Sequence, residues 1–106
     1  MRTMLRVCMD VEAANQALRN GSLQETIESV TKLIQPESTF FTAEGGKRTA
    51  YFIFQLADPS QIPEIAEPFF QTLGAEVDLK PVMNAEELEK GIRNLALQQE
   101  KKKKAA

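Results

Sequence analysis

The sequence predicts a small α+β domain built on one four-stranded antiparallel sheet, and three observations lead to this prediction. Residues 47–57 (KRTAYFIFQLA) are rich in aromatic and β-branched residues with a period of two, which is typical of a strand. The pair Gly45-Gly46 separates this stretch from another apolar run, as in a two-residue hairpin. Residues 62–73 carry apolar side chains at spacings of three and four, which indicates an amphipathic helix.

We expect residues 47–57 to form a central strand with two different faces. The side chains expected to face the core are Ala50, Phe52, Phe54 and Leu56. Those expected on the opposite face are Thr49, Tyr51, Ile53 and Gln55. Because this second face mixes polar and apolar side chains, it is where we expect a polar site.

The chain before this strand is expected to contain one strand and two helices. Residues 3–10 alternate, with the apolar side chains of Leu5, Val7 and Met9 on one face. Asp10 is expected to cap a short helix that ends at Asn20-Gly21, since glycine readily adopts a left-handed conformation. A second helix should begin at once, with Ser22 and Glu25 forming a capping box. Its apolar stripe comprises Leu23, Ile27, Val30, Leu33 and Ile34.

Residues 37–44 are expected to form the second strand. Phe40 and Phe41 are adjacent, so they should point to opposite faces of the sheet. The glycine pair that follows should join this strand to the central strand in an antiparallel hairpin.

Two further helices and one strand are expected after the central strand. Ser60 is the expected N-cap of the helix over residues 62–73, because this places Pro63 in the first turn. Residues 75–83 should form an edge strand, and Asn84 with Glu87 should cap a final helix. The expected apolar stripe of residues 62–73 comprises Ile62, Ile65, Ala66, Phe69, Phe70 and Leu73, and that of the final helix comprises Leu88, Ile92 and Leu95.

The elements therefore follow the ferredoxin-like order βαββαβ, with an extra C-terminal helix. In that arrangement the helices cover one face of an antiparallel sheet, and the first and third strands are central. We expect residues 1–97 to be a single domain and residues 98–106 to be a flexible charged tail.

Composition narrows the classes of function. A chain of 106 residues forms a modest core, so we expect any sizeable cavity to lie between subunits. The formal net charge is −2, and without the lysines at 101–104 it would be about −6, which argues against a nucleic-acid surface on the domain. The absence of histidine removes the commonest general base and metal ligand.

Cysteine usage and hydropathy indicate a cellular setting. The single cysteine, Cys8, excludes an intramolecular disulfide and fits a cytoplasmic location as a half-buried structural thiol. Charged residues interrupt the first eleven residues before a signal peptide could form, and we expect no membrane span. The lysine run is expected to be solvated.

Three stretches carry a resemblance to a known group: TAEGGKRTAYFIFQLADPSQIP, AEPFF and KPVMNAEEL. Through them, residues 3–96 resemble an uncharacterised branch of the small bacterial proteins of the dimeric α+β barrel group. The resemblance implies a homodimer in which two ferredoxin-like sheets pack face to face. Relatives by fold include muconolactone isomerase, cofactor-independent monooxygenases, and haem-degrading or chlorite-converting enzymes. Their chemistry often uses His, Trp or Asn, and the chain has no His and no Trp, so we assign no catalytic residue.

The candidate binding residues are Arg6, Tyr51, Gln55 and Asp78. In the expected strand order Arg6 lies on the non-helical face, beside Tyr51 and within reach of Asp78. Its planar guanidinium suits a carboxylate or phosphate ligand, whereas the structural alternative is a cross-strand pair with Asp78 or Glu76. Tyr51 and Gln55 could orient a ligand, and the alternative for them is a contact between subunits.

These observations lead to two hypotheses of function. The first is a small soluble homodimer that binds a small organic molecule or serves as an interaction module, without metal or cofactor. The second is a cofactor-independent enzyme, of the isomerase or monooxygenase type, that acts on a small cyclic substrate.

Overall fold

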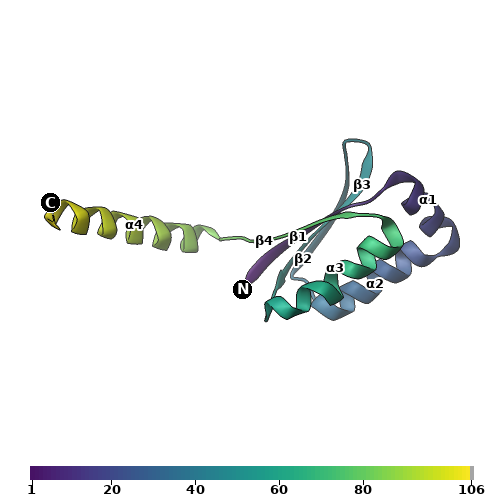
Figure 1. Ribbon diagram of the computed structural model, residues 1–106, viewed down its shortest axis with the longest axis horizontal. Helices are drawn as coiled ribbons and strands as arrows, with labels where there is room; N and C mark the ends of the chain where they lie inside the picture. The colour runs from purple at the N-terminus through teal and green to yellow at the C-terminus, as the bar shows by residue number, and fades with distance from the viewer. Residues whose placement is uncertain (106) are drawn as a thin grey trace.

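The computed structural model describes residues 1–105, and the side chains of residues 1–103. Its helices and strands, in chain order, are β1 (Arg2–Cys8), α1 (Val11–Asn20), α2 (Ser22–Ile34), β2 (Ser38–Glu44), β3 (Lys47–Gln55), a 3₁₀ turn η1 (Pro59–Gln61), α3 (Ile62–Leu73), β4 (Glu76–Pro81) and α4 (Ala85–Ala105). The strands form one sheet, with α1, α2 and α3 on one side and α4 projecting away from it (Figure 1). The predicted α+β class is confirmed.

The sheet has the strand order β2-β3-β1-β4, and every neighbouring pair is antiparallel. The strands β1 and β3 are therefore central, and β4 is at an edge, as expected. The register places Arg6 directly opposite Tyr51 on β3 and opposite Asp78 on β4. Side chains opposite one another in an antiparallel pair lie on the same face, so these three residues share one face of the sheet.

The hydrophobic core lies between the sheet and helices α1 to α3. The side chains of Leu5, Phe52, Phe54 and Phe69 are all buried there. The rings of Phe52 and Phe69 are 6.2 Å apart, centroid to centroid, so Phe69 packs on the core face of the central strand as predicted. The hairpin is also confirmed, since Gly45 and Gly46 have φ angles of 56° and 80°, a region that favours glycine.

One expected helix cap is absent, and another is placed differently. Gly21, with φ 84°, precedes α2 directly. The first amide of α2, that of Ser22, donates to Asn20 Oδ1 at 2.9 Å. The predicted Ser22–Glu25 capping box was wrong. Only Gly21 separates α1 from α2, so Asn20, the last residue of α1, supplies the side-chain acceptor for the first amide of α2. The Asp10 cap is confirmed, with Oδ2 accepting from the Ala13 amide at 2.9 Å.

The cap before α3 lies two residues earlier than expected. Asp58, not Ser60, caps the turn η1, and its Oδ1 accepts from the Ser60 amide at 2.8 Å. Pro59 occupies the first position of this turn, where its missing amide costs nothing, and η1 continues directly into α3. Pro63 does lie in the first turn of α3, as expected.

The predicted apolar stripes of α2 and α3 were too wide. Phe70 is 43% exposed although its neighbour Phe69 is fully buried, and Leu33 on α2 is exposed as well. A helix that lies on a sheet buries only one face, and successive residues are 100° apart around its axis, so Phe70 and Leu33 lie outside the buried face although their neighbours Phe69 and Ile34 lie on it.

Helix α4 begins as predicted and continues further than predicted. The Asn84 amide donates to Glu87 Oε1 at 2.9 Å, and the Glu87 amide donates to Asn84 Oδ1 at 2.8 Å. The helix then runs past residue 97, where we expected a flexible tail to begin, into the lysine run. Its projection gives the molecule dimensions of 64 × 28 × 20 Å (Figure 1).

Candidate functional site

The sheet presents one face without helices, which we call the open face. Its side chains, identified from strand register, include Met4, Arg6, Phe40, Glu44, Tyr51, Ile53 and Asp78. Phe40 is 63% exposed, while Met4, Tyr51 and Ile53 are half-buried. The open face therefore carries an apolar patch, formed by Met4, Phe40, Tyr51 and Ile53, next to an ionic cluster.

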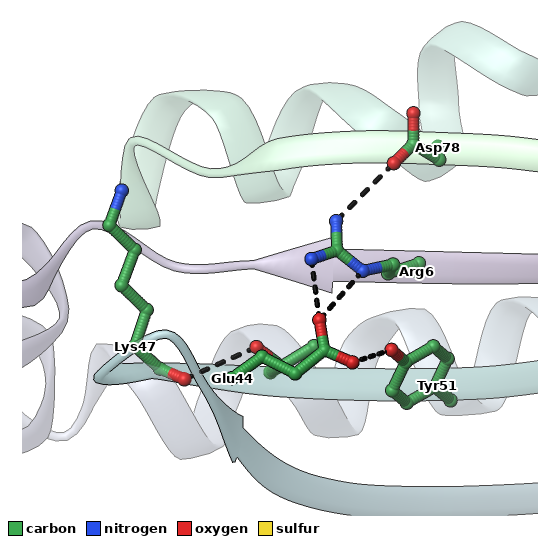
Figure 2. Close-up of polar contacts among 6 residues, drawn as sticks. Arg6, Glu44, Lys47, Tyr51 and Asp78 are labelled. Carbon is green, nitrogen blue, oxygen red and sulfur yellow. Dashed lines mark hydrogen bonds and ion pairs between the residues drawn. The ribbon is translucent and has the colours of Figure 1, made fainter.

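Arg6 is the centre of this ionic cluster (Figure 2). Its Nε and Nη2 atoms both donate to Glu44 Oε2, at 3.1 and 2.6 Å, and its Nη1 donates to Asp78 Oδ2 at 3.4 Å. The Tyr51 hydroxyl donates to the other carboxylate oxygen of Glu44. The two side chains that donate to Glu44 or Asp78, those of Arg6 and Tyr51, thus come from the two central strands, and the carboxylates come from the two edge strands.

The guanidinium of Arg6 is held in its charged form. The hydrogen bond to Glu44 raises the pKa of Arg6 above its ordinary value, with smaller Coulombic contributions from Glu44, Cys8 and Asp78 opposing the effect of desolvation. The Arg6 side chain is 24% exposed, so the pair is partly shielded from water. Four of the five N–H donors of a guanidinium lie on Nη1 and Nη2, and here both of these atoms already have carboxylate partners.

The structure brings together three of the four candidate binding residues. Arg6, Tyr51 and Asp78 belong to one network, and the structural alternative of an Arg6–Asp78 pair is present. Gln55 lies on the same face but opposite Arg2, four residues along β3 from Tyr51. At about 3.4 Å per residue this is roughly 14 Å away, so Gln55 lies outside the network.

Glu44 is the residue that sequence reasoning missed, although it is the nearest partner of Arg6. A signal for it existed in the sequence. A two-residue turn at Gly45-Gly46 makes Glu44 the partner of Lys47, and Lys47 shares the face of Tyr51 because their separation is an even number of residues. Glu76, the other expected partner of Arg6, lies opposite Cys8 instead.

A second feature lies on the helical side of the sheet, between α2 and the β2–β3 hairpin. It is a pocket of about 180 Å³ lined mainly by apolar atoms, and its lining includes Met9, Leu23, Ile27, Phe41 and Arg48. Arg48 Nη1 donates to Asn15 Oδ1 at 3.0 Å. The protomer thus contains a small pocket of its own, and the expectation that any sizeable cavity lies between subunits stays a prediction.

Neither a metal-binding cluster nor a membrane-spanning helix occurs in the described part of the chain. No group of three or more carboxylate or thiol side chains among residues 1–103 is arranged to hold a metal ion. None of the helices described is long and apolar enough to cross a membrane.

The sequence was compared with family models and with curated proteins. No family model matches the chain, and no curated protein matches it either. The resemblance to the dimeric α+β barrel group stays a prediction from the sequence.

Proposed function

We propose that this protein is a small homodimeric interaction module of ferredoxin-like topology, in which two copies pack through their open faces as a dimeric α+β barrel. The observation that carries the proposal is the uncovered apolar surface around Phe40, Met4, Tyr51 and Ile53. Contiguous apolar patches of this kind usually mark an interface, and a two-fold dimer is the commonest way to cover one.

The ionic cluster is compatible with burial in such a dimer. A charge that loses its water is costly unless it is paired and hydrogen-bonded. Arg6 already has Glu44 and Asp78 as partners within its own protomer. We therefore favour a structural role for Arg6, in which it neutralises the centre of the interface.

The experiment that tests the proposal compares two exposed phenylalanines. Phe40→Asp introduces a charge into the open face, while Phe70→Asp introduces the same charge on the outer surface of α3. Sedimentation at micromolar concentration should give wild type and Phe70→Asp at least twice the protomer mass of 11.9 kDa, and Phe40→Asp should lose the association made by the sheet. A wild-type protein that is monomeric under these conditions would refute the proposal.

A small organic ligand is a second candidate, and the pocket beside α2 favours it. An apolar cavity of about 180 Å³ can hold one small ring, and Arg48 at its lining suits an attached carboxylate. Benzoate should therefore shift the resonances of Ile27 and Phe41, and Arg48→Gln should weaken its binding. Toluene has no carboxylate, so equal binding of benzoate and toluene would show that Arg48 does not bind the carboxylate.

The enzyme hypothesis stays a proposal as well. A cofactor-independent isomerase or monooxygenase would hold its cyclic substrate between the two open faces, next to the hydroxyl of Tyr51, with Arg6, Asp78 and Gln55 as the remaining candidate contacts. The bacterial origin, the cytoplasmic location and the absence of a nucleic-acid partner are likewise predictions from the sequence. Mass spectrometry of the native purified protein, looking for a retained small molecule, would separate a ligand-handling role from a purely structural one.

A further inference from the structure

The two edges of the sheet differ in how they are protected against the addition of another strand. The edge strand β4 carries Glu76, Asp78, Lys80 and Pro81. Charged residues and proline are the usual means by which a protein blocks an exposed edge. The other edge strand, β2, has neither a charged residue nor a proline over residues 38–43. The edge of β2 is therefore open to an added strand.

The hairpin determines which backbone groups of β2 face this edge. A two-residue turn is closed by a hydrogen-bonded pair, here Glu44 and Lys47, and such pairs alternate with non-hydrogen-bonded ones along the ladder. The next pair, Ala43 and Arg48, is therefore non-hydrogen-bonded. In agreement, the Arg48 carbonyl accepts from the Met9 amide on the other side of β3. The backbone amide and carbonyl of Ala43 thus point outward, toward an added strand.

The apolar pocket beside α2 lies next to this edge. Phe41 of β2 forms part of its lining, together with Leu23 and Ile27 of α2. The Phe41 ring lies on the helical side of the sheet, 6.3 Å from the ring of the buried Phe52, and it is 59% exposed. A side chain on the helical side of an added strand, beside Phe41, would therefore reach the pocket. A volume of about 180 Å³ suits one apolar side chain.

A guanidinium without an anionic partner lies at the same place. Arg48 lines the pocket and donates to the neutral amide of Asn15, and no described carboxylate forms an ion pair with it. Ala43, directly opposite Arg48 on β2, has only a methyl group as its side chain, so Arg48 can reach across β2 to an added strand. Arg6 reaches across β3 to Glu44 in the same way on the open face.

We propose that the edge of β2 is a docking site for an extended segment of a partner protein, which adds a fifth strand antiparallel to β2. Main-chain hydrogen bonds hold the segment, and its alternate side chains give specificity. An acidic side chain beside Ala43 pairs with Arg48, and an apolar side chain two residues later, beside Phe41, enters the pocket. The site uses the pocket considered above for a small carboxylate. It does not depend on the open-face dimer, because it lies at the sheet edge on the helical side.

The first test uses a fluorescein-labelled peptide, TVETLTV, and fluorescence anisotropy with the full chain. Its Glu and Leu have the order and spacing that an antiparallel strand requires. Exchanging the two in TVLTETV keeps the composition and should weaken binding about tenfold, since both side chains then lose their partners. No binding of TVETLTV at about 1 mM protein, or equal binding of the two peptides, would overturn the inference.

The second test addresses the charge pair. Arg48→Gln should weaken the binding of TVETLTV about tenfold and leave that of TVQTLTV unchanged, because the second peptide has no carboxylate to pair. Lys47→Gln is the matched control, since it removes the neighbouring positive charge from the open face. Equal losses of affinity in Arg48→Gln and Lys47→Gln would mean general charge attraction and would overturn the pairing.

The third test addresses the backbone. Ala43→Pro removes an outward amide without removing a hydrogen bond to β3, and it should abolish peptide binding, whereas Ala43→Ser should not. The peptide provides the same test without altering the protein. Methylation of the Leu nitrogen of TVETLTV should abolish binding, and methylation of the preceding Thr nitrogen, which faces away from β2, should not. Equal binding of the two methylated peptides would refute strand addition.

The outcomes for this site and for the proposed functions are distinguishable. A wild-type protein that is monomeric but binds TVETLTV refutes the open-face dimer and supports the docking site. Binding of benzoate without binding of TVETLTV supports the pocket and refutes the docking site. If TVETLTV does not bind and Ala43→Pro lowers the mass in sedimentation, the edge pairs with a second copy of this chain and the inference is wrong.

Discussion

Arg6 and Glu44 form an ion pair that reaches across a whole strand. Arg6 lies on β1 and Glu44 on β2, and β3 lies between these two strands in the sheet. Neighbouring strands are about 4.8 Å apart, so roughly 10 Å separates the backbones of β1 and β2. Arg6 Nη2 and Glu44 Oε2 are nevertheless 2.6 Å apart, because two long side chains meet above β3. The pair therefore connects the hairpin end of β2 to the centre of the sheet.

Replacing Arg6 by glutamine is expected to lower the melting temperature. The change leaves Glu44, whose side chain is 36% exposed, and the more exposed Asp78 without their cationic partner. Lys80→Gln is the matched control, because it removes a positive charge from the same face opposite Met4, and it should have a smaller effect. Differential scanning calorimetry makes the comparison.

A ligand-binding role for Arg6 has the opposite signature. If Arg6 were a ligand-binding residue without a partner in the free protein, its removal would leave the free protein equally stable or more stable. Phosphate or a small carboxylate would then stabilise wild type and not Arg6→Gln. That pair of results would overturn the structural role.

Phe69→Ala is expected to cost about 3–5 kcal/mol of unfolding free energy, because it removes a fully buried ring that packs on Phe52. The adjacent Phe70→Ala serves as the control. Phe70 is 43% exposed, and surface changes of this kind usually alter stability by about 0.5 kcal/mol or less. Urea denaturation of both variants checks the difference, and similar losses at the two positions would contradict the assigned face of α3.

Acidification is expected to loosen the start of α4 through Glu87. The hydrogen bond from the Asn84 amide is the main cause that lowers the pKa of Glu87, and Arg2 adds to it. Because the folded value lies below the unfolded one, this stabilisation is fully present above the ordinary pKa of glutamate, about 4.3. It is lost as pH falls through the lowered folded value.

The measurement is helix content by far-UV circular dichroism as a function of pH. Glu87→Gln is the matched control, since glutamine can also complete a capping box and does not titrate. Its helix content should vary less below pH 4.3 or so than that of wild type. Identical acid profiles for the two proteins would show that Glu87 does not contribute.

The sequence by itself determined the class of the fold and most of its local features. The alternation in residues 47–57 predicted which side chains of β3 enter the core, and Ala50, Phe52 and Phe54 are all buried. The caps at Asp10 and Asn84 and the glycine hairpin were also predictable. These features depend on residues within a few positions of one another, where backbone geometry and short-range hydrogen bonds decide the outcome.

Only the tertiary structure decided that Arg6 meets Glu44 and which apolar side chains of the helices stay exposed. The hairpin register places Glu44 on the face of Tyr51, but its pairing with Arg6 depends on the reach of two side chains over an intervening strand. The exposure of Phe70 and Leu33 depends on how helices lie on the sheet. The projection of α4 away from the core follows from where β4 ends at the sheet edge (Figure 1). In each case the physical reason is that burial and long-range contacts are set by the packing of whole elements, whereas a sequence pattern reports only on one element at a time.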